Sequence, residues 1–139
     1  MAHALIVLDA SAALALVLTE DEEQEVADLI SDRLSINGQI FVPGLFWHEL
    51  GNGLLMAERS RRIAQRSSSK AVSYFVQLPI ITHQQTDPLI CSRIMGLARE
   101  NQLNYYDASY LELALRFEAP LKSFDPHLQN LKSSFPLIL

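Results

Sequence analysis

Short, continuous apolar runs alternate along this chain with segments in which apolar positions recur at helical spacing. Residues 4–8 form the first run, and its length is typical of a strand buried on both faces of a parallel sheet. Similar runs at 39–42, 79–82 and 121–124 predict three more strands, and 135–139 is a candidate for a fifth. Helical periodicity predicts helices over 12–18, 20–34, 45–59, 71–76, 89–101 and 105–115. This alternation predicts an α/β fold, a three-layer α/β/α sandwich around a mainly parallel sheet of four to five strands.

Cap residues mark the starts of two later helices. Asn104, with Asp107 three residues on, resembles a capping box. Asp125 followed by Pro126 is typical of a helix cap with proline at the first helical position. The chain is long enough for one domain with a substantial core, and we expect residues 1–139 to form a single domain.

The composition restricts the cellular setting. Cys91 is the only cysteine, so neither a disulfide within the chain nor a cysteine-based metal cluster is possible. No apolar run approaches the length of about 18 residues that a membrane-spanning helix needs. The N-terminus lacks the pattern of a signal peptide. We therefore expect a soluble, cytoplasmic protein with no membrane partner.

The net charge of −5 argues at first against binding to nucleic acid. The acids are unevenly distributed, however, because seven of the sixteen lie between residues 20 and 32, where there is no basic residue. The rest of the chain carries eleven basic against nine acidic residues, and five of the basic ones fall between Arg59 and Lys70. A phosphate-binding surface is therefore compatible with the low net charge. A solvated helix end is the simpler interpretation of Arg59–Lys70, and contact with RNA stays an alternative.

Four acidic residues differ in position from the solvated ones. Asp9 and Asp125 each follow an apolar strand. Asp107 lies in the first turn of an apolar helix, and Glu49 lies in a helix with few other charges. Taken singly, each aspartate is more simply explained as a helix cap or as a partner of the helix dipole, and Glu49 as a surface residue. Taken together, the order of elements places all four at the edge of the sheet where the strands end, which favours a shared site.

Four carboxylates at one edge require a counter-charge. Two carboxylates about 4 Å apart repel by roughly 4 kcal/mol at an effective dielectric constant of about 20. A hard divalent cation offsets this repulsion, and an all-oxygen ligand set favours Mg²⁺ or Mn²⁺ over Zn²⁺. Because Mg²⁺ typically bridges carboxylates to substrate phosphates, the pattern suggests phosphodiester hydrolysis.

Four stretches, in this order, resemble the PIN-domain family, and specifically the small VapC-type toxins of bacterial type II toxin–antitoxin systems. They are Leu8-Asp9-Ala10-Ser11, Glu49-Leu50-Gly51-Asn52, Tyr106 to Ala114, and Leu121 to Leu128. Each motif is short, but the ordered set spans nearly the whole chain. The Tyr-Asp-Ala-Ser-Tyr segment at 106–110 is the most specific of them. Asn104 replaces the commoner threonine or serine, which leaves its capping role intact.

The resemblance implies a PIN-like fold and a metal-dependent endoribonuclease that cuts single-stranded or looped RNA. The acidic quartet of the family, which would bind Mg²⁺ or Mn²⁺ and carry catalysis, falls on Asp9, Glu49, Asp107 and Asp125. Residues that match supporting positions are Ser11, Asn52 and Ser123. The resemblance also implies a homodimer and a cognate antitoxin that inhibits the enzyme.

Two other functions stay open. A PIN-like scaffold that binds RNA or a protein partner without catalysis would need no metal. Phosphoryl transfer of the receiver or haloacid-dehalogenase kind would use the aspartate after the first strand as a nucleophile, but Ser11 stands where a second aspartate is expected. His48 and His127 are close in sequence to the predicted site, and we interpret both as packing or surface residues.

Overall fold

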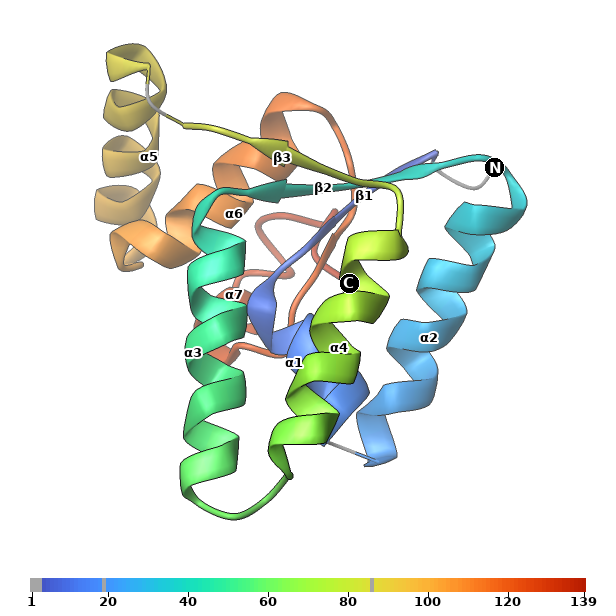
Figure 1. Ribbon diagram of the computed structural model, residues 1–139. Helices are drawn as coiled ribbons and strands as arrows, with labels where there is room; N and C mark the ends of the chain where they lie inside the picture. Colours follow the sequence, from blue (N-terminus) through green and yellow to red (C-terminus); the bar gives the residue numbers. More distant parts are fainter. Residues whose placement is uncertain (1–3, 19, 86) are drawn as a thin grey trace.

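The computed structural model describes residues 4–18, 20–85 and 87–139. Within these residues the chain forms a four-stranded sheet and seven helices (Figure 1). In chain order the elements are β1 (Leu5–Leu8), α1 (Ala10–Leu18), α2 (Glu20–Ser35), β2 (Gln39–Pro43), α3 (Leu45–Arg59), α4 (Gln65–Gln77), β3 (Ile80–His83), α5 (Pro88–Asn101), α6 (Tyr105–Arg116), β4 (Leu121–Lys122) and α7 (Pro126–Gln129). The α/β fold predicted from the alternating pattern is confirmed.

The strands lie in the order β3-β2-β1-β4, and every neighbouring pair is parallel. β1 is therefore an inner strand. It pairs Leu5 with Gln39 of β2 on one side and Val7 with Leu121 of β4 on the other. A strand in this position is covered on both faces, which explains the unbroken apolar run at 4–8.

Helices cover both faces of the sheet. The chain moves from β1 to β2 to β3 in one direction and then returns to β4 on the far side of β1. Right-handed crossovers therefore place α1–α4 on one face and α5 and α6 on the opposite face. Figure 1 shows α1–α4 grouped on one side of the strands. On the other side α6 packs against β1, β2 and β4, and α5 packs against α6.

The apolar stripe predicted for α3 faces the core. Phe46, Leu50 and Leu54 are buried along this helix. The ring of Phe46 meets that of Phe75 from α4 nearly edge to face, with centroids 6.3 Å apart. This packing fixes the side of α3 that carries Glu49. In the described part of the chain, no helix is long and apolar enough to cross a membrane.

α4 begins at Gln65, earlier than the predicted start at Ala71. Ser68, Ala71 and Phe75 are buried at a spacing of three and four residues, so the inward face of the helix begins inside the basic, serine-rich segment. Apolar periodicity did not reveal this start, because a serine occupies the first buried position.

The last two predicted strands are shorter than expected. β4 contains only Leu121–Lys122, because the next residues turn toward the end of β1. There the backbone N–H of Phe124 donates to Ser11 Oγ at 2.9 Å instead of to a neighbouring strand. The segment 135–139 contributes a single parallel bridge, between Leu121 and Ile138. The sheet therefore has four strands.

Candidate active site

Asp9 lies where β1 ends and α1 begins, and it is only 4% exposed. Its Oδ1 accepts hydrogen bonds from Ser11 Oγ at 2.6 Å and from the Ala12 backbone N–H at 3.0 Å. Its Oδ2 accepts one from Ser123 Oγ. The contact with Ala12 is a helix cap, so that interpretation of Asp9 holds. A carboxylate has about four lone-pair positions, and these contacts leave one of them, on Oδ2, for a further ligand.

Ser11 and Ser123 tie the start of α1 to the segment between β4 and α7. Each hydroxyl donates to Asp9 and accepts from a backbone N–H. Ser11 accepts from Phe124 at 2.9 Å, and Ser123 accepts from Asp125 at 3.0 Å. Two parts of the chain that are far apart in sequence are thereby held in one arrangement around the Asp9 carboxylate.

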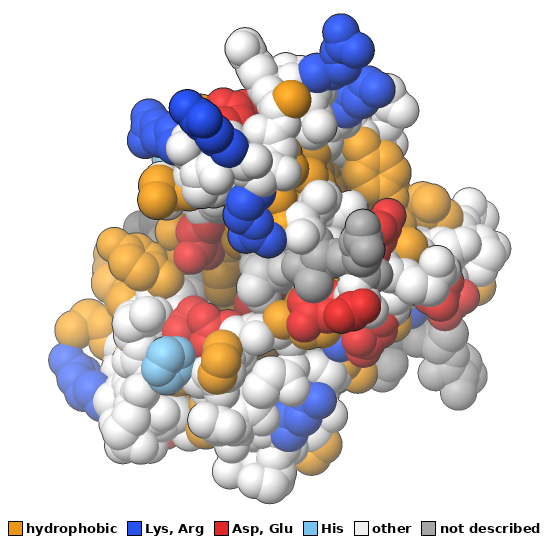
Figure 2. Space-filling view, turned by 90° about the horizontal axis from the view of Figure 1, so that it is seen from below, with side chains coloured by type: hydrophobic (Ala, Val, Ile, Leu, Met, Phe, Trp, Pro, Cys, Tyr) orange, Lys and Arg blue, Asp and Glu red, His pale blue; other side chains and the backbone are white. Residues whose placement is uncertain are grey.

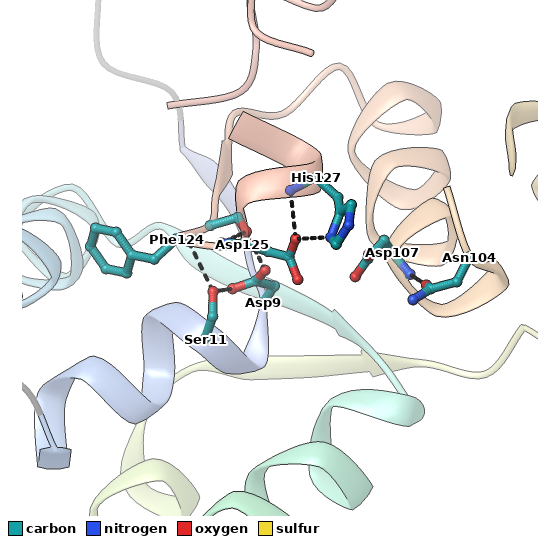
Figure 3. Close-up of polar contacts among 8 residues, drawn as sticks. Asp9, Ser11, Asn104, Asp107, Phe124, Asp125 and His127 are labelled. Atoms are coloured by element: carbon teal, nitrogen blue, oxygen red, sulfur yellow. Dashed lines mark hydrogen bonds and ion pairs between the residues drawn. The ribbon is translucent and has the colours of Figure 1, made fainter. Parts of the chain in front are cut away.

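Asp107, Asp125 and His127 each present a possible ligand atom, and these atoms lie within 4.8 Å of one another. Oδ1 of Asp125 accepts from the backbone N–H of His127 at 2.8 Å and lies 3.1 Å from His127 Nδ1 (Figure 3). We interpreted His127 as a surface residue, and it is exposed, but its ring lies at the edge of the acidic cluster. The sequence signal that places His127 at this cluster is its position two residues after Asp125, the N-cap of α7.

Asp107 occupies the first turn of α6, and its backbone N–H donates to Asn104 Oδ1 at 2.8 Å. One half of the predicted capping box is therefore present. In Figure 3 the Asp107 carboxylate points toward Asp125 and His127 and away from Asn104. Asn104 caps the helix, and the Asp107 carboxylate is left to the cluster.

Glu49 projects from α3, and its Oε1 accepts a hydrogen bond from Tyr110 Oη at 2.7 Å. Tyr110 is buried in α6, and burial together with this hydrogen bond raises the pKa of its hydroxyl far above the usual value. Tyr110 therefore acts as a neutral donor that fixes Glu49. The sequence signal for Tyr110 is its position three residues after Asp107, which places both on one face of the same helix. Asn52 is exposed on α3 and forms no side-chain hydrogen bond with any described residue.

Burial raises the pKa of Asp9 to about 6, from 3.8 for an ordinary aspartate. The hydrogen bonds from Ser11, Ser123 and Ala12 lower it, and the negative charge of Asp125 raises it further. Desolvation therefore outweighs three hydrogen bonds. Within the described part of the chain, no lysine or arginine forms an ion pair with Asp9.

Burial also raises the pKa of Asp107 to about 6. The next causes in size are the negative charges of three other carboxylates, those of Asp125, Asp9 and Glu49. The charge of His127 acts in the opposite direction. Such a dependence requires the three carboxylates to lie near Asp107. Asp107 and Asp125 therefore lie within ligand distance of each other, and Asp9 and Glu49 lie near enough for their charges to act on Asp107.

The raised pKa of Asp9 predicts a pH dependence of stability in the metal-free protein. Because the folded pKa of about 6 exceeds the unfolded value of 3.8, folding favours the protonated form. This contribution is fully present below the unfolded pKa and is lost as the pH rises through the folded one, a change of roughly 3 kcal/mol in the free energy of unfolding. We expect about half of that loss between about pH 5 and about pH 7.5, measured by urea unfolding in EDTA.

The variant Asp9→Asn isolates this effect from the titration of other groups. The difference in unfolding free energy between wild type and Asp9→Asn should grow over the same pH interval. A difference that does not change with pH would contradict the assignment. Added Mn²⁺ should recover stability in the wild type at about pH 7.5, because a ligand that binds only the folded state stabilises it.

A family model described as the PIN domain matches residues 6–133. The chain belongs to the PIN-domain family. A search of curated proteins finds no match.

Three solved structures have a similar fold. PAE2754 from Pyrobaculum aerophilum is 23% identical, with a TM-score of 0.67 over 90% of this chain and 78% of that one. VapC20 from Mycobacterium tuberculosis, a toxin that cleaves the sarcin–ricin loop, is 17% identical, with a TM-score of 0.63 over 90% of this chain and 93% of that one. VapBC2 from Rickettsia felis, solved with a DNA fragment from its promoter, is 12% identical, with a TM-score of 0.67 over 97% and 96%. At these identities the likeness shows a shared fold.

The chemistry of Asp107, Asp125 and His127 fits a divalent cation, because two carboxylates and one imidazole offer oxygen and nitrogen ligand atoms close together. A cation there would also lower the raised pKa values of Asp107 and of the neighbouring Asp9. Figure 2 shows acidic side chains in a hollow on the face seen from the α3–α4 end, with Lys and Arg side chains gathered beyond it. This distribution suits a ligand that carries phosphate groups.

Proposed function

We propose that this PIN domain is a VapC-type endoribonuclease that hydrolyses RNA phosphodiester bonds at a Mg²⁺ or Mn²⁺ site. The observation that carries the proposal is the convergence of four carboxylates, from four separate segments, on the surroundings of Asp107. An acidic residue that only solubilised the protein would not be buried and held by two serine hydroxyls, as Asp9 is.

The four acidic residues would have different roles at the divalent cation. Asp9, Asp107 and Asp125 would bind the ion, and Glu49 would complete the site directly or through a water molecule. When bound, a divalent cation orients and acidifies the attacking water and offsets charge that develops on the phosphate. Asp9 supplies a rigid ligand, since three hydrogen bonds fix its orientation.

Supporting groups keep these ligands in place. Ser11 and Ser123 orient Asp9, and Tyr110 orients Glu49. Asn52 lies one turn beyond Glu49 on α3, where it is exposed and available to RNA. Partners that hydrogen-bond metal ligands typically contribute a factor of about 10 to 100 in affinity or activity.

The proposal extends to the biological setting. VapC20 and VapBC2 suggest a toxin of a toxin–antitoxin pair, inhibited by a cognate antitoxin, and we propose the same for this protein. We further propose that residues 1–139 form a single domain that acts in the cytoplasm as a homodimer. The basic segment Arg59–Lys70 at the α3–α4 turn would lie along the RNA outside the acidic cluster.

Cleavage of labelled single-stranded RNA by the purified protein tests the proposal. We expect products with Mn²⁺ or Mg²⁺ and none in EDTA, with activity restored when the metal is returned. Undiminished cleavage in EDTA would contradict the metal mechanism. Titration calorimetry with Mn²⁺ distinguishes the nuclease from a scaffold that only binds RNA or protein. The scaffold needs no divalent ion, so an absence of Mn²⁺ binding would favour it.

A further inference from the structure

A pocket of about 450 Å³ lies between the N-terminal ends of α3 and α6 and the segment that follows β3. Its volume is in the range of sites for small ligands. Ring and amide side chains make most of its wall, and they are Trp47, His48, Tyr105, Tyr106, Gln84 and Gln85. None of the described residues that line it is a lysine, arginine, aspartate or glutamate.

The pocket adjoins the acidic cluster along both helices. Leu45 lines it one turn before Glu49 on α3, and Tyr106 lines it one turn before Tyr110 on α6. Residues four apart share a helix face and are separated by about 6 Å along the axis. Since Tyr110 donates to Glu49, the pocket begins one helical turn from that contact. Tyr106 also directly precedes Asp107.

We propose that this pocket binds an unpaired base of the RNA whose phosphate lies at the acidic cluster. The inference rests on the proposed nuclease function and deepens it, since it assigns the recognition of an unpaired base to named residues of this pocket. Aromatic faces stack on any base, and amide side chains can hydrogen-bond its edge. A phosphate would find no lysine or arginine among the described lining residues, so the base is the better fit.

The back of the pocket is preformed. Trp47 Nε1 donates to Thr82 Oγ1 at 2.9 Å, which fixes the indole. Gln85 Nε2 donates to the backbone oxygen of Ser109 at 3.2 Å and lies 3.3 Å from Glu112 Oε2. These contacts hold the wall before any ligand arrives, which lowers the ordering cost of binding.

The front of the pocket is open. Tyr106 is 57% exposed, and its ring meets that of Tyr105 at right angles with centroids 6.4 Å apart. Gln84 is also exposed, and its Oε1 lies over Gly44 so closely that a Cβ there would come within 2.8 Å of it. A base entering from solvent would therefore meet Tyr106 first and the Trp47 side last.

Trp47 makes the pocket observable, because it is the only tryptophan in the chain. Its fluorescence should change when single-stranded hexaribonucleotides of each base are added in EDTA, where no cleavage occurs. A self-complementary RNA duplex should leave it unchanged, since paired and stacked bases cannot enter. Anisotropy of a fluorescein-labelled hexamer gives the affinity independently.

Tyr106→Ala should weaken binding of the hexamer by about 5- to 150-fold, the range for loss of one stacked base. Tyr106→Phe should retain the affinity, because the ring remains. Val76→Ala is the control, since Val76 is an exposed side chain near the end of α4, away from the pocket and outside the basic segment, and it should bind as wild type. All variants are measured in EDTA, so the repulsion between the acidic cluster and the RNA phosphates is the same in each and does not affect the comparison.

The outcomes separate this inference from the nuclease proposal. If the wild type cleaves RNA but Tyr106→Ala binds and cleaves like Val76→Ala, the pocket is not a base site and the nuclease proposal stands. If the wild type cleaves nothing, yet single-stranded RNA changes Trp47 fluorescence and Tyr106→Ala weakens binding, the base site stands and the nuclease proposal fails. Equal binding of duplex and single strands would overturn the inference.

Discussion

Replacing Asp9 by asparagine is expected to lower kcat/KM for RNA cleavage by at least about 10³-fold, equivalent to about 4 kcal/mol. The amide has the size of the carboxylate and can still accept from Ser11 and from the Ala12 backbone N–H. The loss therefore reports the missing negative charge at the end of β1 and not a collapsed site. Steady-state kinetics on labelled single-stranded RNA in Mn²⁺ measures it.

The same variant is expected to be more stable than wild type in EDTA at about pH 7.5. Asp9 is ionised there although it is buried, and its raised pKa of about 6 expresses the cost. A neutral amide avoids that cost, so we expect a gain on the order of 2–3 kcal/mol in the free energy of unfolding. Thermal or urea unfolding measures this gain, which should shrink once Mn²⁺ binds the wild type.

Asp32→Asn is the matched control for both effects. Asp32 is exposed on α2, away from the cluster, so neither activity nor stability should change by more than about 0.5 kcal/mol. Wild-type activity in Asp9→Asn would contradict the role of Asp9 as a ligand. A marked loss of stability in Asp9→Asn would show that the charge of Asp9 stabilises the fold, which is the opposite of what its raised pKa predicts.

Replacing Asp107 by asparagine is expected to weaken Mn²⁺ binding by at least about 100-fold, the upper range for groups that only support a ligand. The negative charges of Asp125, Asp9 and Glu49 all raise the pKa of Asp107. The Asp107 carboxylate is therefore repelled by all three. A cation bound there relieves more of that repulsion than one bound at any single exposed acid. Isothermal titration calorimetry with Mn²⁺ gives the affinity directly.

Asp87→Asn is a close control for Asp107→Asn. Asp87 also stands at the start of a helix, where its side chain accepts from the Leu89 backbone N–H at 2.8 Å. Asparagine caps a helix as well as aspartate does, so the control should keep both fold and metal binding. If Asp107→Asn binds Mn²⁺ as tightly as Asp87→Asn, the ion is not held by Asp107.

The pattern of apolar positions predicted most elements of the fold, because strand burial and helix periodicity are written into short stretches of sequence. The prediction for α3 agrees at both ends, Leu45 and Arg59. Where a polar residue takes a buried position, as Ser68 does in α4, the pattern fails locally. Where a tertiary hydrogen bond replaces the ladder, as at Phe124, a predicted strand ends early.

The four acids could be named from sequence because strand ends and helix starts are local features, and the topology of a parallel sheet brings those ends to one edge. Their partners could be named only in part. Ser11 and Ser123 entered through a family motif, whereas Tyr110 and His127 went unrecognised as site residues. The contact between Tyr110 and Glu49 joins residues on different helices, and no spacing along the chain encodes it.

Asp9 shows the division most clearly. Its place after a buried strand, and its capacity to cap α1, follow from neighbouring residues alone. Its raised pKa follows from burial and from the charge of Asp125, which packing brings to it from the far end of the chain. Desolvation and charge–charge coupling depend on distances through space. Local sequence therefore specifies which residues stand at the edge of the sheet, and only the packed fold makes them one charged site beside an aromatic pocket.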